Sequence, residues 1–144
     1  CIRDRFEAAL DKDGIAYKEY AIADTNEVQS VTTAAAGECD VLYIPTDNTL
    51  ASVTETVYNV VAPAKIPVIA GEEGICNGCG VATLSISYYD LGYATGEMAY
   101  EILAEGADIT TMDVRYAPNV TKKYNAKICE ELGITVPDDY VAIQ

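Results

Sequence analysis

Hydrophobic and polar positions in the first part of the chain switch between helical and extended spacing. Apolar residues recur every three to four positions over 2–10, and Gly14 supplies a stop, which together predict an opening helix. A loose alternation then predicts a strand over 15–23. The Asp-Thr-Asn sequence at 24–26 is a candidate N-cap for a second helix over 27–37.

Three short apolar runs follow, and each predicts a strand. They lie at 39–45, 66–70 and 80–86, and the first two are typical of strands buried on both faces. Between the first two, the pattern predicts a helix over 50–61, which Pro63 ends. Buried strands that alternate with helices indicate a parallel sheet.

A long amphipathic helix is predicted to begin near Tyr89 and to close at Gly106. Its apolar stripe consists of Leu91, Ala94, Met98, Ile102 and Leu103. The remaining pattern predicts a strand at 112–116, a last helix over 125–132 and an irregular tail over 134–144.

This order of elements predicts an α/β fold, a three-layer αβα sandwich with a mostly parallel sheet. Such a domain ordinarily opens with a strand, and in a flavodoxin-like order that first strand is central. This chain opens with a helix instead. We therefore expect a sheet with an unpaired strand edge, through which the chain associates, with a second copy of itself as one candidate partner.

Composition and charge exclude several classes of function. The chain has 144 residues, which fits one domain, and a formal net charge of −14. So acidic a chain argues against binding nucleic acid or an anionic membrane surface, which require lysine and arginine. The absence of histidine excludes histidine-based catalytic triads and metal ligands. No apolar run approaches the roughly 18 residues of a membrane span.

Five cysteines occur, and two of them form the motif Cys76-Asn77-Gly78-Cys79. A C-x-x-C unit can be redox-active or supply half of a zinc site. The chain has no second pair and no histidine to complete a zinc site, and the glycines at 78 and 80 lead into a strand rather than a helix start. A disulfide that staples the turn, or two unreactive thiols, therefore remain open beside the redox hypothesis. A lipid anchor on Cys1 is a further alternative, against which stands the missing flexible linker after it.

Ligands of open α/β sheets bind beyond the carboxyl ends of the strands, and here that rule selects three segments. They are 46–49, 71–74 and 85–89. The first, at a helix start, can hold a carboxylate, while the acidic pair of the second can hold an ammonium group. The tyrosines of the third can stack on an aromatic side chain. The rim therefore has the chemistry to recognise an amino acid.

Each of these segments also has a structural interpretation. Residues 46–48 can simply cap the following helix, and Glu72 and Glu73 can be solvated turn residues. The two glutamates could instead serve as the acid and base of a glycosidase-like site, although sequence neighbours rarely have the separation that this chemistry requires. Tyrosines such as Tyr88 and Tyr89 are more often interface or core residues than ligand contacts.

Three linked motifs, at 40–52, 64–74 and 80–96, resemble the substrate-binding proteins of uncharacterised ABC-type transport systems, some of which bind tryptophan or other aromatic amino acids. The resemblance extends over residues 2–134. It implies a type I periplasmic-binding-protein fold, in which two α/β lobes close on a ligand. Residues 1–111 would be the C-terminal lobe without its first strand. Residues 112–144 would supply a crossing strand, a helix that packs on the missing N-terminal lobe, and a tail.

The resemblance also implies which residues face the ligand. The expected set is Thr46, Asp47, Asn48, Glu72, Glu73, Ser87 and Tyr89, with Gly71 and Tyr88 beside them. Ser87 stands where comparable members often carry an aspartate, which shifts the binding of a ligand ammonium to Asp47 or Glu72. No catalytic residue, metal or cofactor is expected.

The implied protein is the solute-binding component of an ABC importer, with no enzymatic activity. It would bind a small amino-acid-like solute, with aromatic amino acids as candidates, and deliver it to a membrane permease. It would be extracellular or periplasmic and lipid-anchored through a missing N-terminal segment. The main alternative is the effector-sensing lobe of a LacI-like transcription regulator. A phosphoacceptor or flavin-type domain fits less well, since no lysine follows the strand that ends at Ile86, and an enzyme that uses Cys76 and Cys79 is the last alternative.

Overall fold

The computed structural model describes residues 2–143, so the lipid-anchor alternative for Cys1 lies outside the described residues. Helices and strands alternate along most of the described chain. The helices are α1 (Ile2–Lys12), α2 (Val28–Ala36), α3 (Asn48–Ala51), α4 (Thr54–Ala64), α5 (Glu73–Cys79), α6 (Tyr88–Leu103) and α7 (Ala126–Leu132). The strands are β1 (Leu42–Ile44), β2 (Val68–Ala70), β3 (Ala82–Ile86), β4 (Val120–Tyr124) and β5 (Val141–Ala142).

The strands form one sheet in the order β1-β2-β3-β4-β5. The first three are parallel, β4 runs antiparallel to β3, and β5 is parallel to β4. The predicted α/β class with a mostly parallel sheet is therefore confirmed. The predicted strands at 39–45, 66–70 and 80–86 are all present. The first is shortened at both ends, and the other two begin two residues later and end where predicted.

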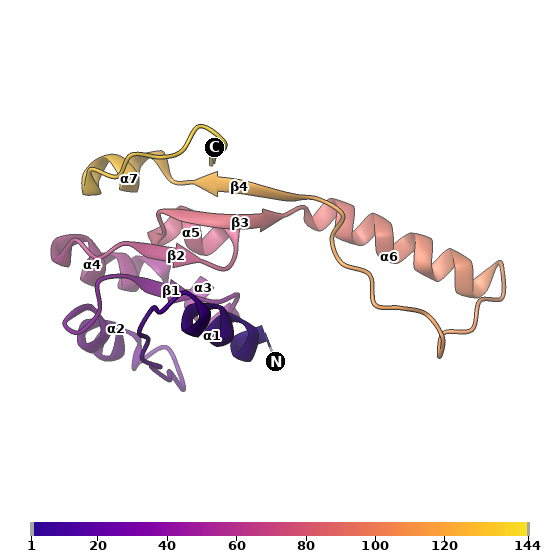
Figure 1. Ribbon diagram of the computed structural model, residues 1–144, viewed down its shortest axis with the longest axis horizontal. Coiled ribbons are helices and arrows are strands. Elements are labelled where there is room, and N and C mark those ends of the chain that lie inside the picture. Colours follow the sequence, from indigo (N-terminus) through magenta and orange to yellow (C-terminus); the bar gives the residue numbers. More distant parts are fainter. Residues whose placement is uncertain (1, 144) are drawn as a thin grey trace.

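The main core lies between one face of the sheet and helices α2, α4 and α5. Its buried members are Val28, Ile44, Val57, Val61, Val68, Ala70, Ile75, Cys76 and Cys79. Val68 and Ala70 point into this core, whereas Ile69 between them is 38% exposed on the opposite face. That face carries α1, because Phe6 stacks on Tyr43 of β1 with ring centroids 4.2 Å apart. Figure 1 shows α1 in front of the sheet and α4 and α5 behind it.

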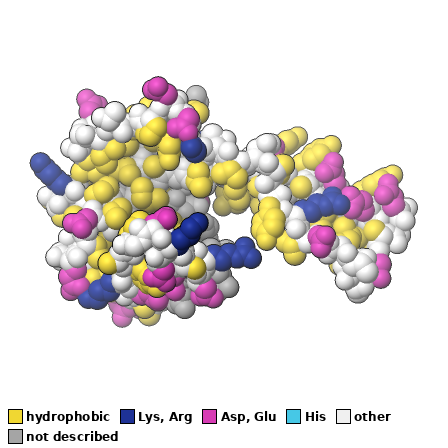
Figure 2. Space-filling model, in the orientation of Figure 1, with side chains coloured by type: hydrophobic (Ala, Val, Ile, Leu, Met, Phe, Trp, Pro, Cys, Tyr) yellow, Lys and Arg dark blue, Asp and Glu magenta, His cyan; other side chains and the backbone are white. Residues whose placement is uncertain are grey.

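Beyond α1, the front face of the sheet is apolar and exposed. Leu84, Ile86 and Val120 lie on this face and are 59%, 37% and 57% exposed. Figure 2 shows hydrophobic side chains gathered across it. The third layer of the predicted sandwich is thus formed only over β1, where α1 lies.

The prediction of a strand over 15–23 is wrong, because these residues follow an irregular path. The faces of the helices give the reason. Connections β1-α4-β2 and β2-α5-β3 run in one direction with their helices behind the sheet, and α1 lies in front. By the right-handed crossover rule, a helix in front of the sheet connects strands in the opposite direction to the helices behind it. A strand over 15–23 would therefore not pair with β1 directly, because the strand that α1 connects to it would lie between the two. The described residues contain no such strand, so residues 15–23 have no neighbour to pair with.

The apolar stripe of α6 does not pack into the core, and none of the described residues of α6 is buried. Figure 1 shows α6 projecting from the end of β3 and the chain returning beside it to β4. We call α6 together with residues 104–119 the arm. The predicted strand at 112–116 lies in the arm and is absent. The crossing strand is β4 at Val120–Tyr124, which finds a hydrogen-bonding neighbour in β3.

The predicted last helix is present as α7, but its packing differs from the expectation. Asn125 caps α7, and Gly133 ends it in a left-handed conformation with φ of 67°. The apolar residues Ile128 and Cys129 are buried against Val81 of the same lobe, so α7 already has its partner here. The tail is not wholly irregular, because β5 joins the sheet.

Two local predictions also need correction. The helix predicted over 50–61 is divided into α3 and α4 at Val53, whose φ of −134° and ψ of 31° are not helical. Pro63 lies inside the last turn of α4 rather than ending it. The N-cap of α2 is Glu27, whose side chain does not cap the helix but accepts from the Ala23 N–H at 3.0 Å. The predicted cap residue Asp24 accepts from the Asn26 N–H instead.

Candidate functional site

The structure brings two of the three predicted segments into direct contact. Loop 1 (residues 46–49) follows β1, and loop 2 (residues 71–74) follows β2. The Gly71 N–H donates to the Ile44 carbonyl oxygen at 2.7 Å, and the Thr46 hydroxyl donates to the Gly71 carbonyl oxygen at 3.1 Å. A side chain at position 71 would meet the backbone of Thr46 at 2.6 Å. Glycine at this position therefore lets the two loops touch.

The third segment, loop 3 (residues 87–89), lies further along the sheet. Ala70 at the end of β2 is level with Thr83, and β3 continues to Ile86. Loop 3 therefore begins three residues beyond the level of loop 2, which is roughly 10 Å in an extended strand. The three loops share one end of the sheet, but loop 3 overhangs the other two.

In loop 1, Asp47 has the capping role that the sequence left open. Its Oδ1 accepts a hydrogen bond from the Leu50 N–H at 2.9 Å, which caps the four-residue helix α3. Among the described residues, its Oδ2 has no hydrogen-bond partner. Thr46 and Asn48 are exposed on either side. Loop 1 thus presents one carboxylate oxygen, a hydroxyl and an amide to solvent.

In loop 2, both glutamates are engaged by the protein. The Glu72 carboxylate caps α5, accepting from the Gly74 N–H at 2.8 Å and from the Ile75 N–H. Oε2 of Glu73 accepts from the Ser85 hydroxyl at 2.9 Å and from Lys123 Nζ at 2.7 Å. The hydrogen bonds from Lys123 and Ser85 lower the pKa of Glu73 below its usual value. Among the described residues, Oδ2 of Asp47 and Oε1 of Glu73 have no hydrogen-bond partner, whereas both carboxylate oxygens of Glu72 are occupied.

In loop 3, Ser87 caps α6, since its hydroxyl oxygen accepts from the Asp90 N–H at 3.1 Å. The rings of Tyr88 and Tyr89 are 64% and 80% exposed. Neither ring is used to fill the core of this lobe. Their aromatic faces are available to a ligand or to another surface.

The C-x-x-C motif lies on helix α5, which the sequence analysis missed. Cys76 and Cys79 are both free and buried, and burial raises the pKa of each thiol to about 12. The Cys79 thiol donates to the Ile75 carbonyl oxygen at 3.4 Å. Redox catalysis requires an accessible thiol of lowered pKa, so this environment contradicts the redox hypothesis and favours unreactive thiols. The described residues contain no cluster of acidic and cysteine side chains that could hold a metal ion.

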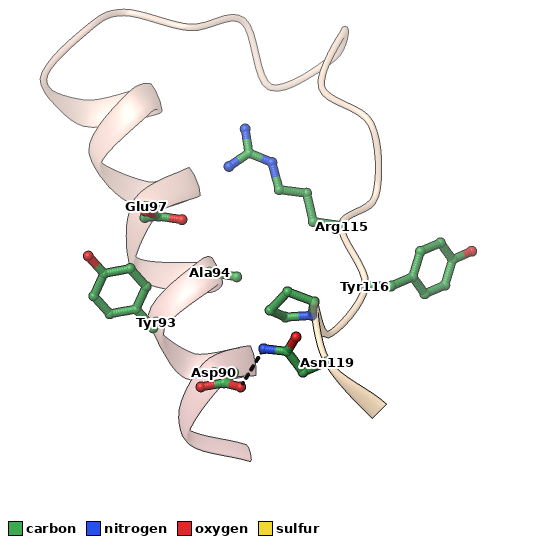
Figure 3. A pocket seen from close by; sticks show the side chains of 8 residues that line it. Asp90, Tyr93, Ala94, Glu97, Arg115, Tyr116 and Asn119 are labelled. Carbon is green, nitrogen blue, oxygen red and sulfur yellow. Dashed lines mark hydrogen bonds between the residues drawn. The ribbon is translucent and has the colours of Figure 1, made fainter. Parts of the chain in front are cut away.

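A cavity of the described residues lies in the arm. It has a volume of about 440 Å³ and lies between α6 and residues 115–119. Figure 3 shows the Arg115 side chain extending toward α6, while the rings of Tyr93 and Tyr116 point outward, away from the space between α6 and the returning chain. Arg115 pairs with Glu101 at 2.6 Å, and the Asn119 amide donates to Asp90 at 3.3 Å. These contacts tie the returning chain to α6.

Comparison with known proteins identifies the family. Residues 4–143 match the family model described as ABC transporter substrate binding protein. The chain belongs to this family. The match covers nearly the whole chain and confirms the resemblance drawn from the three motifs. It also gives no support to the transcription-regulator alternative.

Relatives of this family member include proteins with known ligands. A tyrosine-binding protein of Clostridioides difficile (strain R20291) is 40% identical over 100 residues, covering 66% of this chain and 29% of that protein. A ligand-free, open substrate-binding protein with adhesive properties from Clostridium difficile shares 35% identity, with a TM-score of 0.74 over 98% of this chain and 49% of that one. A Streptococcus pneumonia ABC domain in complex with L-Trp shares 32% identity, with a TM-score of 0.82 over 94% of this chain and 45% of the other.

A conserved domain protein from Vibrio cholerae is also similar, with 29% identity and a TM-score of 0.85. This chain spans 49% of that structure, so it covers about half the length of the solved relatives. The matched family and the two clostridial relatives are described as binding proteins, and the streptococcal domain is in complex with L-Trp. The individual ligand contacts of this chain remain predictions.

Proposed function

We propose that this chain is the C-terminal lobe of the solute-binding component of an ABC importer. The observation that carries the proposal is the family match over residues 4–143, combined with coverage of about half of each solved relative. The solute is a small amino-acid-like molecule, and the tyrosine-binding and L-Trp-bound relatives favour an aromatic amino acid. The protein would then release its cargo to a membrane permease without transforming it.

Loops 1 and 3 supply complementary chemistry for such a solute. The free oxygen of Asp47 can accept a hydrogen bond from an ammonium group, and so can the hydroxyl oxygen of Thr46, whose proton is donated to Gly71. The Asn48 amide can donate to a carboxylate. The exposed ring of Tyr89 can stack on an aromatic side chain that reaches toward the overhanging end of β3. Glu72 and Glu73 would contribute less directly, because their carboxylates already accept protein hydrogen bonds.

We also propose that the arm belongs structurally to the other lobe. Its helix α6 has an apolar stripe but no buried residue, which is the condition of a helix whose packing partner lies elsewhere. The predicted domain boundary near residue 111 would then be replaced by two crossings, one at each end of the arm. Residues 120–143 stay with this lobe, supported by β4, α7 and β5.

We propose an extracellular or periplasmic location, as expected for a component that delivers solutes to a permease. None of the helices in the described part of the chain is long and apolar enough to cross a membrane. Anchoring by lipid through a preceding segment remains a prediction. So does association through the free edge of β1.

A thermal-shift screen of amino acids on the full-length protein tests the proposal. Binding of an aromatic amino acid should raise the melting temperature, and Asp47→Ala should reduce that rise. Asp40→Ala is the matched control, because Asp40 is an exposed acid at the opposite end of β1. If no amino acid stabilises the protein, the proposed ligand class is wrong. If both variants respond equally, Asp47 is only a helix cap.

A further inference from the structure

Three side chains from different parts of the sequence form a polar cluster under loop 2. Glu73 opens α5, Ser85 lies in β3 and Lys123 lies in β4. Oε2 of Glu73 accepts from Ser85 at 2.9 Å and from Lys123 at 2.7 Å. Ser85 is buried, and the side chains of Lys123 and Glu73 are 27% and 39% exposed. We call these three residues the strap.

The strap connects the candidate ligand loop to the two strands that carry the arm. Glu73 belongs to loop 2. The chain leaves this lobe through β3 and returns through β4, and these strands pair in antiparallel register, with Thr83 opposite Lys123. The strap lies two residues before loop 3. It therefore holds loop 2 and both crossing strands in one arrangement at the point where the arm begins.

The surroundings leave Glu73 without a substitute partner for Lys123. The neighbouring Lys122 lies on the opposite face of β4, level with Leu84, and pairs there with Asp139 at 2.5 Å. Removing Lys123 would thus leave the half-buried carboxylate of Glu73 with only the Ser85 hydroxyl. A carboxylate in that position gains from moving toward water, and loop 2 would move with it.

We propose that the strap fixes loop 2 relative to the crossing strands, so that Lys123 acts as a positioning residue for ligand affinity without touching the ligand. The inference rests on the proposed function, because it assumes that loop 2 lines the solute site. It assigns Glu73 to the strap rather than to the ligand.

Calorimetry of the full-length protein with L-tyrosine and L-tryptophan tests the effect on affinity. Lys123→Met should weaken binding by about 10-fold, equivalent to about 1.4 kcal/mol. Glu73→Gln should weaken it in the same direction. The charge-exchanged pair Glu73→Lys with Lys123→Glu should recover most of the loss. Lys122→Met, the same change on the other face of β4, is the matched control and should leave affinity unchanged.

A purely structural strap would give a different pattern. Lys123→Met would then lower the melting temperature while affinity stayed equal to that of Lys122→Met, and the proposal would be wrong. The charge-exchanged double variant is the control for this interpretation. Its ligand affinity should recover only if the ion pair is restored, and a general gain in stability would not restore it.

Hydrogen exchange separates failure of the strap from failure of the proposed function. In the ligand-free protein, Lys123→Met should speed exchange of the Gly74 and Ile75 amides relative to Lys122→Met. If neither amino acid binds the wild type but exchange changes as expected, the proposed ligand is wrong and the positional role of the strap stands. If exchange in loop 2 is the same in both variants, the strap does not hold loop 2.

Discussion

Replacing Gly71 by alanine should push loops 1 and 2 apart. An added Cβ would lie 2.6 Å from the Thr46 nitrogen and 2.9 Å from the Pro45 carbonyl carbon, and both are backbone atoms. Ordinary contacts of this kind begin near 3.4 Å, so the two chains must separate by about 0.8 Å. The movement would stretch the 2.7 Å hydrogen bond from Gly71 to Ile44.

Gly71→Ala should lower the free energy of unfolding because it overpacks a tightly packed site. Such substitutions cost roughly 1–3 kcal/mol, and a domain of this size loses roughly 2–4 °C in melting temperature per kcal/mol. We therefore expect Gly71→Ala to melt several degrees below the wild type. Because Thr46 and Asp47 move with loop 1, affinity for an amino acid should fall as well.

Thermal denaturation and calorimetric titration of the full-length protein measure both effects. Gly37→Ala is the control, since a Cβ at Gly37 makes only ordinary contacts, at 3.6 Å, with the carbonyl oxygens of Thr33 and Ala34. Gly37 ends α2 in a right-handed helical conformation, in which alanine should be neutral or stabilising. A Gly71→Ala protein with unchanged melting temperature and affinity would show that loops 1 and 2 do not touch as described.

Three further predictions concern the core, the thiols and the pH dependence. Ile75→Ala should destabilise the protein by about 2–5 kcal/mol in denaturant unfolding, because Ile75 is fully buried in the main core; a smaller loss would mean that the core adjusts around the gap. Cys76 and Cys79, with pKa values of about 12, should have a thiolate fraction about 1000-fold below that of an ordinary thiol at pH 8, so a thiol reagent should label them only on unfolding; rapid labelling of the native protein would contradict their burial. The pKa of Glu73 is lowered in the folded state, so its contribution to stability is present above the unfolded value of 4.5 and is lost as the pH falls through the lower folded value. Glu73→Gln should therefore flatten the acid side of the stability profile, and an unchanged profile would contradict the ion pair with Lys123.

The sequence pattern predicted the parallel part of the sheet well. Strands β1 and β2 lie in continuous apolar runs, and β3 has apolar residues at alternate positions, separated by Thr83 and Ser85. It missed α5, since the glycines at 74, 78 and 80 indicate a turn. Apolar Ile75 and Cys79, four residues apart, were the signal that could have identified this helix.

The crossing strand β4 could not be predicted from the sequence, for a different reason. Its sequence Val-Thr-Lys-Lys-Tyr shows no apolar alternation, because Lys122 and Lys123 form ion pairs on opposite faces of the sheet. The alternation at 112–116 indicated a strand instead, but in the arm that segment has no neighbouring strand. A hydrogen-bonding partner decides which extended segment becomes a strand, and local pattern does not reveal the partner.

The candidate site was located by a general rule on strand ends, and its loops do share that end of the sheet. What the sequence could not give is which protein groups each carboxylate of the loops contacts. Glu73 and Lys123 are 50 residues apart, and only the fold brings them together. The end of β3 at Ile86 was predicted, but the overhang of loop 3 depends on the register of β3 against β2, which the sequence does not reveal.

The most direct test of the account is a calorimetric titration of the full-length protein with L-tyrosine and L-tryptophan. We predict saturable binding of at least one of them, with one molecule bound per chain and recovered unchanged. A flat titration with both, or chemical conversion of the bound amino acid, would contradict the assignment of this lobe to an amino-acid importer.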